Sequence, residues 1–161
     1  AAALEEITYE GYGPGGIGII IETATDNRNR TLPEVKTALV KNGGRVADAG
    51  SVMFQFARKG VIRVAATGED ALLTILDAGA EDAVEEDGEI IVYTDQKDLM
   101  SVRKALVDAE LKVEDAELQY IANTPVEIND QETADKVMKV LDALDDVDDV
   151  VNVHTNADIT V

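Results

Sequence analysis

Apolar residues follow two different periods along the chain, and these periods predict strands and helices. Short runs rich in Val and Ile are typical of strands, whereas apolar residues spaced three and four positions apart are typical of helices. The runs predict strands at 17–24, 52–58, 61–65, 82–86, 89–93, 113–121, 126–128 and 150–154. Apolar residues with the helical spacing predict helices at 31–42, 67–79, 95–106 and 130–144.

Turn and capping residues mark the ends of several of these elements. Thr31 and Glu34 have the spacing of a capping box, which predicts that the first helix begins at Thr31. Gly43-Gly44 supplies a stop after that helix. Asp87-Gly88, between two strand-like runs, is a hairpin signal. We therefore expect the strands at 82–86 and 89–93 to pair.

The order of the elements predicts an α+β fold made of two ferredoxin-like domains. Residues 61–122 have the order β-α-β-β-α-β, which is the ferredoxin-like order. The elements that flank this segment form a second split βαβ unit, so one domain is inserted in the other. We expect a discontinuous domain at 1–59 and 123–161 and an inserted acidic domain at 60–122.

The composition limits the possible chemistry. The 161 residues include 45% apolar and 4% aromatic residues and no Cys, which excludes disulfides and thiol nucleophiles. There is a single His, and neither Ser lies in a nucleophile elbow. No apolar stretch has the length of a membrane span. We predict a cytoplasmic protein that is not an enzyme, has no cofactor or metal site and does not bind a membrane.

The net charge of −19 is unevenly distributed along the sequence. Residues 1–63 carry eight basic and seven acidic side chains, whereas residues 64–161 carry six basic and 26 acidic ones. Because Lys and Arg supply most of the non-specific affinity for nucleic acid, we expect such a contact in the first part. The acidic part is either a solvated surface, including the run 145–149 at a helix end, or a face for a basic protein partner.

A glycine-rich segment, YEGYGPGG at 9–16, is the most distinctive motif. Gly11, Gly13 and Gly16 match the dinucleotide spacing G-x-G-x-x-G, but a strand rather than a helix is predicted to follow. We therefore reject a cofactor site and expect a tight turn between two strands, formed by the loop that also contains Pro14 and Gly15. Tyr9 and Tyr12 either pack inside the fold or stack on a base or a peptide.

The second motif, TDNRNRT at 25–31, predicts an anion site. Arg28 and Arg30 precede the predicted helix start, where backbone amides favour a phosphate group. The alternative is that Asp26 and Glu34 pair with these arginines while neighbouring Asn residues shape the turn. The candidate nucleic-acid contacts are Asn27, Arg28, Asn29 and Arg30, extended by Lys36, Lys41 and Arg45.

The two motifs and their spacing resemble the YebC/PmpR family of bacterial gene-expression regulators, whose mitochondrial relatives activate translation. The resemblance implies a DNA-binding transcriptional regulator or, alternatively, a ribosome-associated translation factor that binds ribosomal RNA or tRNA. Family members begin with a basic helical domain, whereas this chain begins at Ala1-Ala2-Ala3. We therefore expect a family member without that domain, which would make most of the nucleic-acid contact. A purely protein-binding acidic module is a third possibility.

Overall fold

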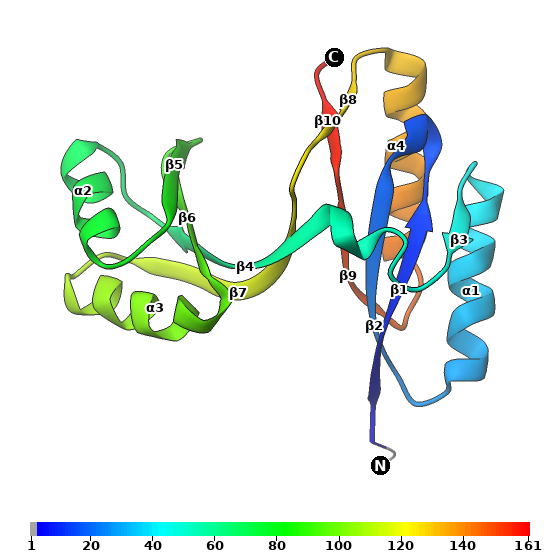
Figure 1. Ribbon diagram of the computed structural model, residues 1–161, viewed down its shortest axis with the longest axis horizontal. Helices are drawn as coiled ribbons and strands as arrows, with labels where there is room; N and C mark the ends of the chain where they lie inside the picture. Colours follow the sequence, from blue (N-terminus) through cyan, green and yellow to red (C-terminus); the bar gives the residue numbers. More distant parts are fainter. Residues whose placement is uncertain (1–2) are drawn as a thin grey trace. The chain divides into compact units, whose positions relative to one another are not determined.

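The protein forms two compact units, as a computed structural model of the chain describes for residues 3–161 (Figure 1). One unit, which we call the split unit, contains the chain up to Ala57 and from Ile121 onward. The other, the inserted unit, contains Arg58–Tyr120. Within the described residues, each unit contains two α-helices and a four-stranded sheet, which confirms the predicted mixed α and β architecture.

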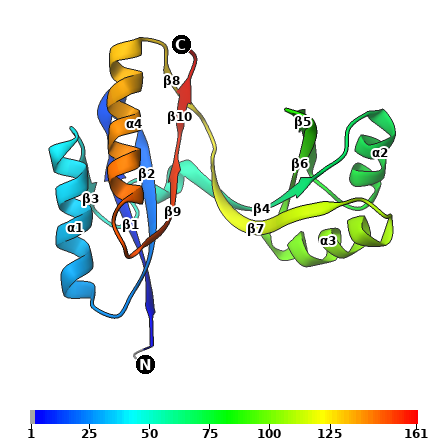
Figure 2. The same cartoon turned by 180° about the vertical axis from the view of Figure 1, so that it is seen from behind.

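The split unit is a sheet with two helices on one face (Figure 2). Its sheet has the order β3-β1-β2-β9, and neighbouring strands are antiparallel. The strands are β1 (Glu5–Tyr12), β2 (Gly18–Thr25), β3 (Arg45–Ala47) and β9 (Val150–Thr155). The helices are α1 (Arg28–Lys41) and α4 (Gln131–Asp145). A separate parallel pair consists of β8 (Val126–Ile128) and β10 (Ala157–Ile159).

The core of the split unit lies between this sheet and its helices. Side chains alternate along a strand, so Ile19 and Ile21 point to the same face of β2. There they pack with Leu39 of α1 and with Val140 and Leu144 of α4, and all five are fully buried. Burial of such a side chain stabilises a fold by about 1.5–3 kcal/mol. This aliphatic core therefore fixes both helices on the sheet.

The inserted unit has the predicted order of elements. These are β4 (Phe56–Val64), α2 (Glu69–Asp77), β5 (Asp82–Glu86), β6 (Glu89–Asp95), α3 (Leu99–Asp108) and β7 (Val113–Ala122). Its sheet has the order β5-β6-β4-β7, and Ile75 of α2 and Leu106 of α3 pack on Ile62 and Val92. Asp87 and Gly88 have φ values of 50° and 81°, as the predicted hairpin requires.

The split unit has a four-stranded sheet like that of the inserted unit, but its strands follow one another in a different order along the chain. In the inserted unit, β6 lies between β5 and β4 and follows β5 in the chain. The corresponding position in the split unit, between β3 and β2, is taken by β1, which precedes β2. The strand at 126–128, predicted to close this sheet, pairs with β10 instead. A short connection joins β1 directly to β2, and this local hairpin occupies the central position.

The strand predicted at 52–58 is wrong in its first half. Residues 48–55 form turns, including a 3-10 turn at Met53–Gln55, and the sheet strand after α1 is β3. The cause is the buried carboxylate of Glu10, which accepts hydrogen bonds from the backbone N–H groups of Gly50, Val52 and Met53 at 2.6–2.9 Å. Burial raises the pKa of Glu10, but these three hydrogen bonds outweigh it and lower the pKa.

No helix within the described residues is long and apolar enough to cross a membrane.

Candidate nucleic-acid interface

The glycine loop is the short connection between β1 and β2. A 3-10 turn at Pro14–Gly16 closes it, with φ values of 77° at Gly15 and 80° at Gly16. A Cβ atom at Gly15 would lie 2.8 Å from Ile128 Cδ1 and 3.0 Å from Thr133 Cγ2. The loop therefore packs closely against the beginning of α4. Strand β2, rather than an α-helix, follows Gly16, as the sequence predicts.

Both tyrosines of the glycine motif have partners within the split unit. Tyr9 packs against the aliphatic core. The Arg45 guanidinium lies 4.5 Å from the centre of the Tyr12 ring, a cation–π contact. The Tyr12 hydroxyl donates a hydrogen bond to the carbonyl oxygen of Ser51 at 3.4 Å. These contacts favour packing roles over stacking on a base.

Helix α1 begins three residues earlier than the capping-box pattern predicts. Asn27 is the N-cap, and its side chain accepts a hydrogen bond from the Asn29 backbone N–H at 3.2 Å. Arg28 and Arg30 therefore lie in the first turn of the helix and not in a loop before it. Thr31 is buried, and its hydroxyl donates to Asp149 Oδ2 at 2.7 Å.

Asp149 is the centre of the polar network at this end of α1. Arg30 binds it through Nη2–Oδ1 and Nε–Oδ2 contacts of 2.9 and 3.2 Å, and Thr25 Oγ1 donates to Oδ2 at 3.2 Å. Only 7% of Asp149 is exposed. Hydrogen bonds from Arg30, and then from Thr31, lower the pKa of the Asp149 carboxyl. The chain's own carboxylate thus supplies the anion that a helix N-terminus favours.

The remaining partners of the two arginines are also acidic residues of the chain. Arg30 pairs with Asp26 at 3.0 Å, and Arg28 pairs with Glu5 at 3.3 Å. Asn27 and Asn29 contribute to the cap. Arg30 is thus held by the buried carboxylate of Asp149, whereas the pair between Arg28 and Glu5 is exposed and weak. The prediction of a phosphate site at Arg28 and Arg30 stays a prediction, and the network at Arg30 favours the alternative of internal pairing. Glu34, which the alternative interpretation included, is not part of this network.

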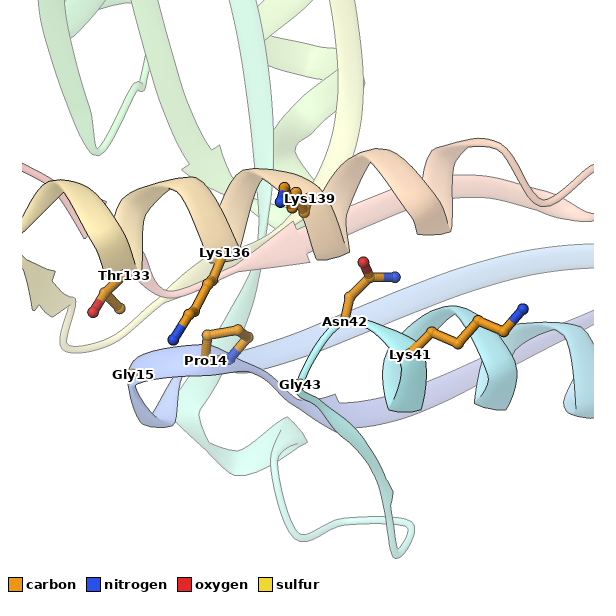
Figure 3. Close-up of a pocket in the computed structure, with 8 residues that line it drawn as sticks. All are labelled: Pro14, Gly15, Lys41, Asn42, Gly43, Thr133, Lys136 and Lys139. Atoms are coloured by element: carbon orange, nitrogen blue, oxygen red, sulfur yellow. The ribbon is translucent and has the colours of Figure 1, made fainter.

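The C-terminal end of α1 has a different environment. A pocket of about 510 Å³ lies between this end of the helix, the glycine loop and α4 (Figure 3). Its lining residues are Pro14, Gly15, Lys41, Asn42, Gly43, Thr133, Lys136 and Lys139. Figure 3 shows the Lys136 side chain pointing towards the loop at Pro14, whereas Lys41 extends along its own helix. Three lysines from two helices thus line a pocket beside a short glycine turn.

A neighbouring pocket of about 530 Å³ shares Lys41 and Asn42 with this one but also contains Glu34, Asp146 and Asp148. Two smaller depressions share residues with the first pocket. One is lined by Lys36, Thr37, Val40 and Lys41. The other is lined by Tyr12, Gly13, Gly16, Gly43, Gly44 and Arg45. Five cations therefore border three connected depressions, and we call them the basic rim: Lys36, Lys41, Arg45, Lys136 and Lys139.

Within the described residues, few cations of the basic rim form ion pairs. Lys136 lies 3.3 Å from Glu132, but both side chains are exposed, and such pairs are weak. Among the described residues, Lys36, Lys41 and Lys139 have no carboxylate within ion-pair distance. Cations here also interact favourably with the C-terminal end of α1, whose carbonyl groups carry partial negative charge.

The structure thus divides the predicted contacts between the two ends of α1. Three of them belong to the basic rim: Lys36, Lys41 and Arg45. The other four lie at the N-terminal end of α1: Asn27, Arg28, Asn29 and Arg30. Fourteen residues of helix separate these ends by about 21 Å. Sequence reasoning missed Lys136 and Lys139, which follow the inserted unit in the chain. Lys136 and Lys139 are three residues apart, which places both on the same, exposed side of α4, and this spacing could have indicated a basic surface there.

The two folded units have similar net charges, although the two parts of the sequence do not. The split unit carries seven basic and 17 acidic side chains, and the inserted unit carries seven and 16. The segment from Ile121 onward brings ten carboxylates to the same unit as the less acidic first part. Positive charge is therefore a local property of the rim and not of a whole unit.

Comparisons with known proteins identify the family. A family model described as the second and third domain of TACO1/YebC matches residues 4–157. The chain belongs to the TACO1/YebC family. Curated relatives from Francisella tularensis subsp. tularensis strain FSC 198 and subsp. novicida strain U112, each named a probable transcriptional regulatory protein, are 47% identical over 163 residues. The match covers 99% of this chain and 65% of each relative.

A solved structure supports the TACO1/YebC fold. The crystal structure of Aq1575, a conserved hypothetical protein from Aquifex aeolicus, superimposes with a TM-score of 0.93 at 39% identity. It covers 100% of this chain and 68% of the Aquifex chain. The resemblance to the YebC family is thus confirmed. The relatives' names describe those proteins as probable regulators of transcription, and this chain spans about two thirds of their length.

Proposed function

We propose that this chain belongs to a non-enzymatic, DNA-binding regulator of transcription and that its contact with the DNA backbone is the basic rim. The observation that carries the proposal is the gathering of five cations from three segments around the glycine loop. Lys41, Lys136 and Lys139 belong to two different helices and meet only in the folded chain.

The chemistry of the rim suits phosphate groups rather than base edges. Lysine ammonium groups act as point charges towards phosphate oxygens, and contacts to phosphate position a protein without reading sequence. The backbone of the glycine loop can approach a ligand closely at Gly16, where an added Cβ atom would meet nothing within 4 Å. Because the whole chain carries a net charge of −19, we expect weak, strongly salt-dependent binding.

Fluorescence anisotropy with a labelled DNA duplex tests this proposal at about 50 mM salt, where phosphate contacts are strong. The variant Lys41→Glu/Lys136→Glu should bind at least about tenfold more weakly than the unmodified chain. The control Lys97→Glu/Lys112→Glu makes the same change in net charge on the inserted unit and should retain more of the affinity. Equal losses in both variants would mean that net charge, and not the rim, determines binding.

A ribosome-associated translation factor is the second candidate. Two features of the chain favour it: a lysine-lined pocket in the split unit, and an inserted unit in which acidic side chains outnumber basic ones by nine. A ribosome presents both ligands, because ribosomal RNA offers phosphates and ribosomal proteins offer basic segments. The acidic surface would then have a basic protein partner, a feature that DNA alone does not offer.

Cell fractionation separates the two candidates. Ribosomes and chromatin are isolated from cells that carry the protein, and its amount in each fraction is measured. Chromatin retention that Lys41→Glu/Lys136→Glu abolishes supports the transcriptional proposal, and ribosome retention with the same sensitivity supports the second candidate. An acidic protein-interaction module, the third possibility, predicts that rim variants affect neither DNA nor RNA association.

A further inference from the structure

The sheet of the inserted unit has one face that neither of its helices covers. Side chains alternate along each strand, and Ile62, Val64, Ile90 and Val92 point towards α2 and α3. Their neighbours therefore point to the opposite face, which we call the outer sheet face. The strand register then determines which of these neighbours lie beside one another.

An aromatic and aliphatic row crosses the outer sheet face. Tyr93 of β6 lies opposite Val61 of β4, and Ile91 of β6 lies opposite Val84 of β5. Directly opposed residues on adjacent strands are close enough for their side chains to interact. Val84 is 42% exposed, and Ile91 and Tyr93 are half-buried. Val61 is only 6% exposed, so the accessible apolar surface of this face lies on β5 and β6.

Carboxylates flank the tyrosine on this face. Asp82 is the cross-strand partner of Tyr93 on β5, and Glu86 follows on the same side of that strand. Burial first, and then the charges of Glu86 and Asp82, raise the pKa of the Tyr93 hydroxyl, which agrees with their proximity to it. Within the described residues, neither carboxylate forms an ion pair.

The cations of the outer sheet face already have partners in the inserted unit. Arg63 lies 3.4 Å from Glu89 and 3.2 Å from Glu114, and Lys59 lies 2.8 Å from Glu81. The uncompensated charge beside Tyr93 is therefore negative. A nucleic acid would be repelled here, although an exposed aromatic ring on a sheet could otherwise stack on a base.

We propose that the outer sheet face binds an Arg-rich or Lys-rich segment of a partner protein, with a cation over Tyr93 between Asp82 and Glu86. The charge complementarity selects a basic segment, and the apolar side chains of Val84 and Ile91 bind aliphatic side chains between the cations. Among the described residues, guanidinium groups lie 4.5 Å from two tyrosine ring centres, Arg45 over Tyr12 and Arg58 over Tyr120.

This inference deepens the proposed basic protein partner and does not depend on the basic rim. An extended segment in which cationic and aliphatic residues alternate at every second position fits it best, because residues two apart in a strand point to the same side. A synthetic 12-residue peptide of three Arg-Ser-Val-Ser repeats, which we call the Arg-Val peptide, is therefore a suitable probe, and its Gln-for-Arg counterpart is the matched control.

Isothermal titration of the 161-residue chain with the Arg-Val peptide tests the proposal at about 50 mM salt. We expect binding of this peptide and none of its Gln counterpart. Asp82→Asn/Glu86→Gln should weaken binding about fivefold, as should Tyr93→Ala, whereas Tyr93→Phe, which keeps the aromatic ring, should retain it. Circular dichroism checks that each variant is folded.

A second pair of variants separates local recognition from net charge. Asp70→Asn/Asp77→Asn removes two carboxylates from α2, on the other side of the inserted unit, and should change peptide affinity less than twofold. Equal weakening by both pairs, no binding of the peptide, or preferential binding of DNA by this face would overturn the inference. Lys41→Glu/Lys136→Glu should not weaken peptide binding, so the two proposals fail independently.

Discussion

The two ends of α1 carry similar numbers of cationic side chains but opposite surroundings. At the N-terminal end, Arg30 is bound by Asp26 and by the buried carboxylate of Asp149. At the C-terminal end, Lys41 faces a pocket with two further lysines of α4. An arginine next to helix amides is therefore not by itself an anion site. Whether a cation is available to a ligand depends on carboxylates that distant parts of the chain bring to it.

The largest expected effect on stability is the loss of the Asp149 carboxylate. Asp149→Asn removes the charge that Arg30 and Thr31 contact and should lower the free energy of unfolding by about 3 kcal/mol. The control Asp148→Asn alters an exposed neighbour and should change it by less than about 0.5 kcal/mol. Urea denaturation measures both. Similar values for the two variants would mean that the N-terminal network does not stabilise the fold.

The basic end depends on backbone shape rather than on charge pairing. At Gly15 the backbone has a positive φ, which an alanine adopts only with strain. Gly15→Ala also places a methyl group 2.8 Å from Ile128 Cδ1, so we expect the free energy of unfolding to fall by about 2–3 kcal/mol. Gly16→Ala has the same backbone strain with no atom within 4 Å and should cost only about 1 kcal/mol. Thermal unfolding of the two variants isolates the packing contribution. Equal costs would contradict close packing of the loop on α4.

The stability of the N-terminal network should also depend on pH. The folded-state pKa of Asp149 is lowered, so its contribution is present above the unfolded value of about 3.9 and is lost as pH falls through the folded value. The difference in unfolding free energy between the unmodified chain and Asp149→Asn should therefore shrink below about pH 4. Glu10, whose pKa is also lowered, keeps its own dependence in both proteins. A difference that stays constant down to pH 2 would contradict the pairing.

The smallest expected effect compares single neutral substitutions at the two ends. Each phosphate contact contributes about 0.9 to the slope of log affinity against log salt for duplex DNA. Lys41→Gln should reduce that slope by up to this amount, whereas Arg28→Gln, at the end of α1 that lies outside the basic rim, should reduce it less. Anisotropy titrations at several salt concentrations give both slopes. A reduced slope for Arg28→Gln alone would reverse the comparison.

Much of the fold follows from local patterns in the sequence. The period of the apolar residues predicts all four α-helices and most strands, and Asp87-Gly88 predicts its hairpin. The exceptions depend on long-range contacts. Glu10 bends the segment at 50–53 by hydrogen bonds across 40 residues, and β1 takes the sheet position predicted for 126–128. No local pattern contains that information.

The candidate site was less predictable for the same reason. Asp149 belongs to an acidic run that resembles a solvated helix end, yet it is buried against Arg30 and Thr31. Lys136 and Lys139 reach the glycine loop only because the chain returns to the split unit after residue 120. Composition along the sequence therefore indicated three of the five cations of the basic rim, Lys36, Lys41 and Arg45, but not the two lysines of α4 that folding brings beside them.

Amide chemical shifts of the ¹⁵N-labelled chain, recorded while a short DNA duplex is added at about 50 mM salt, test the central claim most directly. Binding at the basic rim predicts progressive shifts at 13–16, 41–45 and 133–139, with little change at 26–31. Shifts concentrated at 26–31, with the glycine loop and α4 unaffected, would contradict the account and return the contact to Arg28 and Arg30.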